Sequence, residues 1–281
     1  MPFKVNSTVL VNSSSAITST PTIALDYERY TLSQGVIHVI HIPHQSQFVI
    51  APAIAPGLAP LDQLAQEYGA IAAVNGGFFD PTNGKTTSYV VLQGEVVADP
   101  TENERLVTNP DLLPYLEQIF DRTEFRQYQC GDEIRYDITA HRNSPPAGCQ
   151  LQSSLGAGPR LLPELTLEEE GFTTIINGET VRDALGSTQP NARTAIGINL
   201  AGDVVLVMAA QLPNPGAEAG ISLQALAEFM KTLGIEKAMN LDGGSSSSLY
   251  FQGETHYGKV NAEGNWVERP IKSALLVLQE T

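Results

Sequence analysis

Two glycine-rich turns carry the polar side chains of this 281-residue chain that are best suited to chemistry. The first is Asn75-Gly76-Gly77, which directly follows the apolar run 70–74. Glycines at the end of a strand let the backbone approach a ligand closely, and their N–H groups can bind an anion. Asn75, Gly76 and Gly77 are therefore candidates for a substrate site. A tight turn that binds nothing is the alternative.

The second turn is Asn240-Leu241-Asp242-Gly243-Gly244, and four serines follow it, beginning with Ser245 and Ser246. Its carboxylate, Asp242, is the candidate catalytic base or nucleophile, and the neighbouring amide, glycine and serine groups are candidates for binding substrate. The serines do not form the Gly-x-Ser-x-Gly pattern of a nucleophile elbow, and no histidine is marked as their base. Hydrogen bonding to a substrate or to the turn is the role predicted for them.

Two arginines occur in similar surroundings. Arg160 follows the glycine-rich stretch 156–159, and Arg193 stands at the entrance of the apolar run 194–198. A planar guanidinium is suited to bidentate contact with a phosphate or carboxylate group. Both arginines are therefore candidates for binding an anion, with a salt bridge to a neighbouring acid as the alternative for each.

The remaining metal-binding residue types do not form a site in the sequence. A strand over 36–43 would point His38 and His44 to one face and His41 to the other, so these three histidines do not converge. Cys130 and Cys149 have no Cys/His cluster near them and do not predict a zinc site. A disulfide between them, which would indicate an oxidising compartment, and two independent thiols both remain open.

The elements that must position these groups follow from local patterns. Residues 60–68 and a segment beginning at Ser222 have helical apolar faces that end at glycines, and Ser222 is suited to cap the second helix. Strands are expected over 70–74, 88–92, 194–198 and 203–208, and a short helical pattern covers 112–120. The expected fold class is α+β, a single domain of mixed β-sheets flanked by helices.

The domain boundaries follow from composition. Residues 1–22 are rich in Ser and Thr, lack the basic start and apolar core of a secretory signal, and are expected to form a flexible lead before a domain over 23–281. The proline-punctuated stretch 99–152 is expected to be a loop-rich insertion.

Charge and hydropathy exclude two classes of function. The chain has 16 Lys and Arg against 31 Asp and Glu, a formal net charge of −15, so a nucleic-acid partner is not expected. One or two well-placed arginines can still bind a small anion. No apolar run reaches the roughly 18 residues of a transmembrane helix.

At the two turns and at Arg193 the chain resembles the phosphodiester glycosidase family, from about residue 35 to 279. The matching segments include Val74-Asn75-Gly76-Gly77-Phe78-Phe79, the run 192–197, the helix from Ser222, the turn 240–246, and Arg269-Pro270 before the last apolar strand.

The resemblance implies hydrolysis of a sugar-1-phosphodiester, which releases the sugar and leaves a phosphomonoester, on glycoconjugate or exopolysaccharide substrates. It places Asn75, Gly76, Gly77, Arg193, Asn240, Asp242, Gly243 and Gly244 at the active site. In the physical interpretation, Arg193 binds the phosphate with help from Arg160, and Asp242 serves the water attack. Asp80 is a weak candidate for a second carboxylate.

Two departures from the family pattern matter. Ser245 stands where a third glycine is usual, and the central strand ends in Met208-Ala209-Ala210-Gln211 without a carboxylate. A carbohydrate-binding or polysaccharide-assembly protein without catalysis is therefore an alternative. A hydrolase that uses Ca²⁺ or Mg²⁺ at Asp242 and the nearby asparagines is another, since these metals prefer oxygen ligands. The expected location is outside the cytoplasm, and the sequence leaves the sugar and the oligomeric state open.

Overall fold

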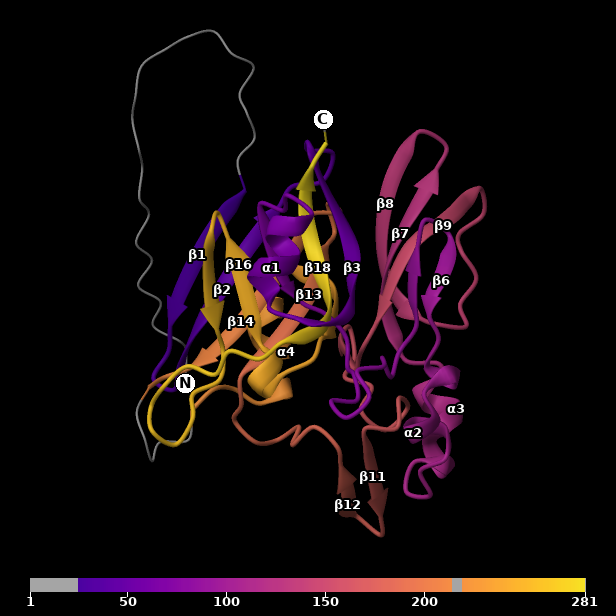
Figure 1. Ribbon diagram of the computed structural model, residues 1–281, viewed down its shortest axis with the longest axis vertical. Coiled ribbons are helices and arrows are strands. Elements are labelled where there is room, and N and C mark those ends of the chain that lie inside the picture. Colours follow the sequence, from indigo (N-terminus) through magenta and orange to yellow (C-terminus); the bar gives the residue numbers. More distant parts are fainter. Residues whose placement is uncertain (1–24, 214–218, 281) are drawn as a thin grey trace, which may run out of the picture.

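The computed structural model describes residues 25–213 and 219–280 and consists mainly of β-sheet (Figure 1). Strands account for 47% of the described residues and helices for 14%, so this part of the molecule is richer in sheet than the expected helix-flanked α+β fold. The helices that flank the sheets are few and short. The Ser/Thr-rich lead over 1–22 lies outside the described residues.

Sheet I is a six-stranded antiparallel sheet that holds both arginine motifs. Its central strand β14 is apolar and buried along its whole length, as expected for the run 203–208. In spatial order its strands are β1 (Asp26–Thr31), β2 (Gly35–Ile42), β14 (Val204–Gln211), β13 (Arg193–Asn199), β15 (Ile235–Asn240) and β10 (Arg160–Leu162).

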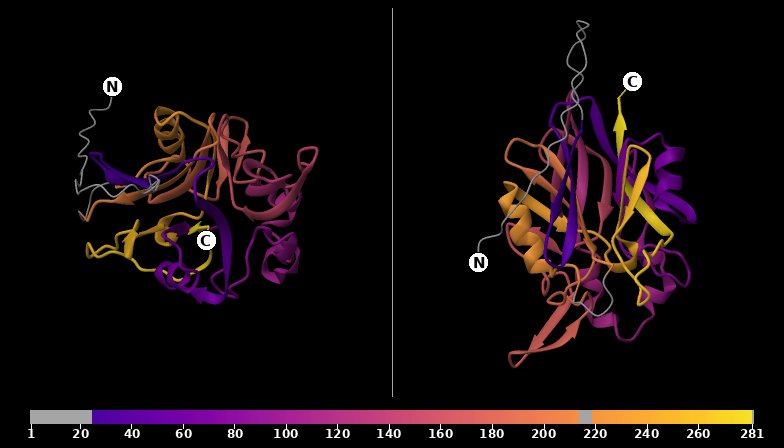
Figure 2. Two further views of the ribbon diagram at one scale, coloured as in Figure 1. Left: turned by 90° about the horizontal axis from the view of Figure 1, so that it is seen from above. Right: turned by 90° about the vertical axis from the view of Figure 1, so that its left-hand side faces the viewer.

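Sheet II has five strands and carries the Asn75 turn at the end of its central strand. In spatial order they are β17 (Glu254–Tyr257), β16 (Ser248–Phe251), β4 (Ala72–Asn75), β18 (Ile271–Gln279) and β3 (Phe48–Ala59). Sheets I and II pack face to face, with sheet III beside them (Figure 2). One apolar core receives residues from all three sheets, so a shift of any sheet would expose surface of the other two.

The two longest helices cover the outer faces of sheets I and II. Helix α4 (Leu223–Thr232) packs its apolar face on sheet I, and the Ser222 hydroxyl caps it by accepting a 3.1 Å hydrogen bond from the Ala225 N–H. Helix α1 (Leu61–Glu67) packs on sheet II through Leu61, Leu64 and Ala65. Both expected helices are therefore confirmed. No helix among the described residues is long and apolar enough to cross a membrane.

Sheet III overturns the expectation of a loop-rich insertion over 99–152. Its strands in spatial order are β6 (Glu95–Ala98), β5 (Val90–Leu92), β9 (Cys149–Gly156), β7 (Thr123–Cys130) and β8 (Glu133–Ala140). The prolines lie between these strands. The side chains of β7 are mainly polar, which makes the strand hard to predict from the sequence. Two of them, Glu124 and Arg126, pair with each other inside the protein.

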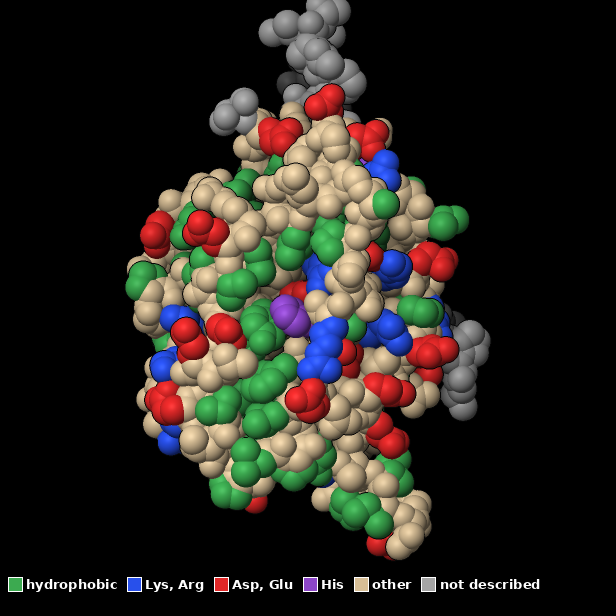
Figure 3. All heavy atoms as spheres, turned by 90° about the vertical axis from the view of Figure 1, so that its right-hand side faces the viewer, with side chains coloured by type: hydrophobic (Ala, Val, Ile, Leu, Met, Phe, Trp, Pro, Cys, Tyr) green, Lys and Arg blue, Asp and Glu red, His purple; other side chains and the backbone are tan. Residues whose placement is uncertain are grey.

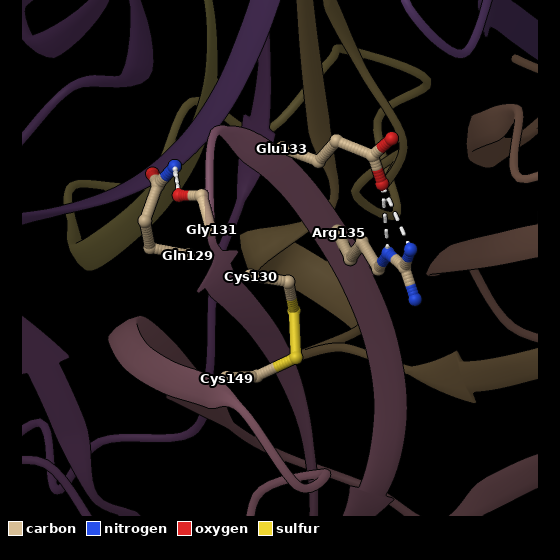
Figure 4. Close-up of a disulfide and its surroundings, with 6 residues drawn as sticks. All are labelled: Gln129, Cys130, Gly131, Glu133, Arg135 and Cys149. Carbon is tan, nitrogen blue, oxygen red and sulfur yellow. Dashed lines mark hydrogen bonds and ion pairs between the residues drawn. A yellow bond between two sulfur atoms is a disulfide. The ribbon is translucent and has the colours of Figure 1, made fainter.

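The two cysteines form a disulfide, which selects between the alternatives left open by the sequence. Cys130 at the end of β7 lies directly opposite Cys149 at the start of β9, with their Cα atoms 4.1 Å apart (Figure 4). The bond therefore joins two paired strands next to the β7–β8 turn at Gly131.

Shorter elements connect the sheets. The expected helical pattern over 112–120 is realised as a 3₁₀ turn and a single turn of α-helix. A hairpin of β11 and β12 projects from the body (Figure 1). These elements are β11 (Thr173–Ile176), β12 (Glu179–Asp183), α2 (Glu104–Val107), α3 (Leu116–Ile119) and the 3₁₀ turns Pro100–Glu102, Leu113–Tyr115 and Gly244–Ser246.

Candidate active site

The two glycine turns meet at one end of the sheets. Strand β4 ends at Asn75 beside the start of β18, and β15 ends at Asn240 beside the start of β13. The Asp242 N–H donates a 3.0 Å hydrogen bond to the Gly76 carbonyl, which ties the second turn to the first. Antiparallel pairing places strand ends and strand starts at the same edge, and for this reason motifs far apart in the sequence come together here.

Asn75 is the internal brace of this junction. Its side chain has no exposed surface, and its Nδ2 donates a 2.7 Å hydrogen bond to the Asp242 carbonyl. Its Oδ1 accepts hydrogen bonds from the Thr194 hydroxyl at 2.7 Å and from the Ser248 N–H at 3.1 Å. One amide thus joins sheets I and II and the loop after Asp242.

Gly76 and Gly77 are required by close backbone contacts. A Cβ atom on Gly77 would lie 2.2 Å from the Gly156 carbonyl oxygen, and one on Gly76 would lie 2.5 Å from the Ser273 hydroxyl. The Gly77 N–H donates to that hydroxyl at 3.1 Å. This turn packs against protein, and its glycines serve the junction of the sheets.

Asp242 is the partly exposed carboxylate of the site. Burial raises its pKa to about 6, although the Ser246 hydroxyl, the Gly243 N–H and the positive charge of Arg269 each lower it. The Gly243 N–H donates to its Oδ1 at 2.9 Å. A carboxylate with such a pKa is mostly ionised at neutral pH and is still basic enough to accept a proton.

Arg269 is the cation whose positive charge lowers the pKa of this carboxylate. No role was expected for its side chain from the sequence. Its Nη1 donates a 2.8 Å hydrogen bond to the Ser245 hydroxyl, and its guanidinium lies 5.1 Å from the centre of the Phe79 ring. The side chain is half-buried and forms no ion pair among the described residues. Its position before β18, in a segment that matched the family, was the available signal.

The Arg193 guanidinium is occupied by backbone carbonyls. It is 3% exposed, and it donates to the Ile221, Leu185, Gly186 and Gln189 carbonyls at 2.7–3.2 Å. Burial lowers its pKa to about 10, a shift opposed by the charge of Asp183. Four of its five N–H groups are thus used, three on the loop between β12 and β13 and one on Ile221 before α4.

Arg160 and Asn240 lie on the paired strands β10 and β15, and each side chain donates to backbone carbonyls. The Arg160 Nε donates to the Glu164 carbonyl at 3.5 Å. The Asn240 Nδ2 donates to the Gly158 and Leu241 carbonyls at 3.1 and 2.6 Å. The buried Asn240 Oδ1 has no hydrogen-bond partner in the described part of the chain.

The loop after Asp242 is a short 3₁₀ turn. The Gly244 N–H donates to the Ala192 carbonyl at 2.8 Å, and Gly244 adopts a φ of 60°, which favours glycine. Ser245 is half-buried next to Arg269, whereas Ser246 is buried beside Asp242. Ser245 is therefore the serine of this loop whose hydroxyl already contacts a cation.

Asp80 and Gln211, the two positions considered for a second carboxylate, both make contacts within the protein. Asp80 accepts a hydrogen bond from the Arg105 Nε at 2.7 Å; burial raises its pKa, but the Thr82 N–H and Arg105 together bring it below the ordinary value. Gln211 at the end of β14 donates to the Ala219 carbonyl and accepts from the Val260 N–H. Within residues 25–213 and 219–280, no group of three or more His, Cys, Asp or Glu side chains could hold a metal ion.

A cavity of about 360 Å³ lies at the opposite end of the sheets from Asp242. It is lined by the β2–β3 turn, the β7–β8 turn and the end of β18, and it contains none of the residues predicted for the site. The polar groups of the two glycine turns lie at the other end of the sheets.

The model of the family described as phosphodiester glycosidase matches residues 68–278 of this chain. The chain belongs to the phosphodiester glycosidase family. The match begins after β3, so β1, β2 and β3 lie outside it although they complete sheets I and II. No curated protein matches the chain by sequence.

Three solved structures share the fold. The catalytic domain of zebrafish N-acetylglucosamine-1-phosphodiester α-N-acetylglucosaminidase, auto-inhibited by its pro-peptide, is 16% identical with a TM-score of 0.67, and the alignment covers 95% of this chain and 87% of that one. A putative exported protein from Burkholderia pseudomallei is 15% identical with a TM-score of 0.60, covering 90% and 74%. A hypothetical protein from Synechocystis is 17% identical with a TM-score of 0.60, and the chain spans 62% of its length while 91% of this chain is covered.

Proposed function

We propose that this protein hydrolyses a glycosyl phosphodiester, releasing a sugar and leaving a phosphomonoester. Family membership supports this reaction class. The observation that carries the proposal is that Asp242, whose pKa burial raises to about 6, shares its loop with Ser245, the hydroxyl that accepts a 2.8 Å hydrogen bond from Arg269. A carboxylate and a cation on two adjoining, partly exposed loops are what a cationic sugar and an anionic phosphate would each require.

The two charges have separate roles in this proposal. Arg269, with the Ser245 hydroxyl beside it, binds the phosphate, because the Arg193 guanidinium is already occupied by backbone carbonyls. Asp242 stabilises the positive charge that develops on the sugar. The phosphate leaves as an anion, so the reaction depends less on a general acid than the hydrolysis of an ordinary glycoside does.

Hydrolysis of a sugar-1-phosphodiester by the wild type and by Asp242→Asn tests this function. We expect kcat to fall by about 100-fold or more in the variant, the size of effect found when a charge that stabilises a transition state is removed. Equal rates in the two proteins would remove Asp242 from the chemistry. The assay is run with and without a chelator, and activity that survives exhaustive chelation would exclude a Ca²⁺- or Mg²⁺-dependent reaction.

A second candidate function is glycan binding without hydrolysis. It is favoured by Gln211, which stands at the end of the central strand where the family commonly has an Asp, and whose amide is engaged on both sides by backbone groups. Binding in a glycan screen together with no hydrolysis of any phosphodiester would support this candidate. The disulfide and the exported relative also support a location in an oxidising compartment for either function.

A further inference from the structure

A small cavity lies beside the Asn75 turn, on the side of sheet III. It is lined by Ser88, Tyr89, Arg122, Glu124 and His141, together with Gly156 and the two apolar residues Ile119 and Phe120. The space open to the centre of a water molecule is about 10 Å³, which suffices for a single water. A buried acid, a histidine and an arginine around one such space form an arrangement that packing does not require.

Glu124 lies at the closed end of this cavity with half of its carboxylate unpaired. Its side chain is 1% exposed, and its Oε1 accepts from the Arg126 Nε and Nη2 at 2.9 and 2.6 Å. The buried Oε2 has no hydrogen-bond partner within the described residues. An unpaired carboxylate oxygen in such a place is costly, which indicates that it serves a water or a reacting group in the cavity.

His141, just after β8, is held by this carboxylate at the mouth of the cavity. Its Nδ1 lies 3.1 Å from the Glu124 Oε1, and its ring stacks on Tyr89 with centroids 3.9 Å apart and an angle of 6° between the planes. The carboxylate favours the proton on Nδ1, so Nε2 is the basic atom. The side chain is 31% exposed, so the imidazole is open to solvent on part of its surface.

Positive and negative side chains both surround His141. Arg122, 8% exposed, lies over the Phe172 ring at 3.8 Å and donates from its Nε to the Glu170 carbonyl, and the negative charge of Glu170 opposes the lowering of the Arg122 pKa by burial. Arg126 is neutralised by Glu124, and Arg142 pairs at the surface with Glu117. On the face of the molecule that carries sheet III, basic and acidic side chains both lie around one exposed histidine (Figure 3).

Contacts connect this cavity with the candidate active site. Gly156, which lines the cavity, packs so closely on Gly77 that no Cβ fits between them. The rings of Phe78 and Phe172 are 5.7 Å apart, and Arg122 covers the second of them. The Asp242 N–H donates to the Gly76 carbonyl, and Gly156 contacts Gly77, so the second glycine turn and the wall of this cavity both touch the Asn75 turn.

We propose that His141, oriented by Glu124, is the general base of the reaction; this inference rests on the proposed glycosyl phosphodiester hydrolysis. His141 Nε2 removes a proton from water as the water oxygen bonds to the anomeric carbon. The bond from that carbon to the phosphate oxygen breaks, and its electron pair leaves with the phosphomonoester. The proton on His141 then passes to solvent. Glu124 is a positioning residue, since it acts through His141.

The test is the hydrolysis kinetics of His141→Ala and His141→Gln, with His44→Gln as a matched control at a half-buried histidine outside this cavity. A general base contributes about 10²- to 10⁴-fold, so we expect kcat to fall at least about 100-fold in both variants. KM should change less than about threefold, and added imidazole should restore part of kcat in His141→Ala. The control should keep the wild-type kcat.

Each alternative outcome is informative. If both His141 variants keep more than about one third of the wild-type kcat, or if imidazole rescues nothing while the variants melt at the wild-type temperature, His141 is not the base although the proposed function stands. If the variants melt early, Glu124→Asp, which keeps the partner of Arg126, should still lower kcat more than it raises KM. If the wild type hydrolyses no glycosyl phosphodiester, the proposed function and this inference both fail.

Discussion

Arg193, at the start of strand β13, and Arg269, in the loop before strand β18, lie at the same junction and have opposite roles. Arg193 is buried, and four backbone carbonyls accept its hydrogen bonds. Arg269 is half-buried, rests on an aromatic ring and donates to a serine hydroxyl. The first side chain has almost no N–H group left for a ligand, whereas the second still has most of its donors.

The same division runs through the rest of the junction. The Asn75 side chain makes its hydrogen bonds inside the protein, one of them to the Asp242 carbonyl. The Asp242 side chain, by contrast, is partly exposed and has a raised pKa. Bracing and binding are thus assigned to different residues of the same motifs. A motif match alone does not separate the two roles, because both depend on polar groups next to glycines.

The largest expected effect is on stability, from Arg193→Met. Four backbone carbonyls would lose a charged donor that is itself buried, so we expect the free energy of unfolding to fall by about 4 kcal/mol. Urea denaturation measures this difference. The matched control is Arg160→Met, which removes one long contact from a half-buried arginine and should cost less than about 0.5 kcal/mol. Similar losses in the two variants would break the contrast between a bracing and a surface arginine.

Arg269→Met should have the opposite signature. Stability should stay within about 0.5 kcal/mol of the wild type, because the side chain is half-buried and makes one hydrogen bond. The Kd for glucose-1-phosphate should rise about 10- to 100-fold, from the loss of a charge-assisted contact worth roughly 1.5–3 kcal/mol. Titration calorimetry measures the change, with Arg269→Lys as the conservative variant. An unchanged Kd would return the phosphate site to another cation.

The smallest expected effect is a gain in stability in Asp242→Asn that depends on pH. Burial raises the pKa of Asp242 to about 6 from the ordinary 3.8, so the folded protein binds this proton more tightly than the unfolded chain does. Its contribution to stability is therefore full below about pH 4 and is lost as the pH rises through about 6.

The Asn side chain does not ionise and escapes this loss. At pH 8 we expect Asp242→Asn to be more stable than the wild type by about 1–2 kcal/mol, after a discount for partial exposure, and no more stable at pH 3.5. Thermal unfolding at the two pH values measures both differences. A variant that is less stable than the wild type at pH 8 would show that Asp242 braces the loop as Asn75 does.

The amino-acid sequence by itself determined the features that depend on neighbours along the chain. The Ser222 cap and apolar face of α4, the uniformly apolar β14, and the glycine turns at the ends of β4 and β15 all follow from local periodicity and turn chemistry. The family also followed, because its motifs keep their order along the chain. The strands of sheet III were not predicted because β7 is rich in polar side chains, and several of their partners come from distant segments: Gln127 accepts from Ser153 on β9, and Arg126 donates to the Asn143 and His141 carbonyls.

Tertiary structure alone decided which of the polar residues are free to act. The carbonyls that accept from Arg193 lie up to 28 positions away, and no local pattern reveals that they occupy its guanidinium. The pairing of Cys130 with Cys149 and the meeting of Glu124 with His141 depend on strand register in the same way. A side chain's type limits the chemistry it can perform. Its hydrogen-bond partners, which come from across the fold, determine whether that chemistry is available to a substrate.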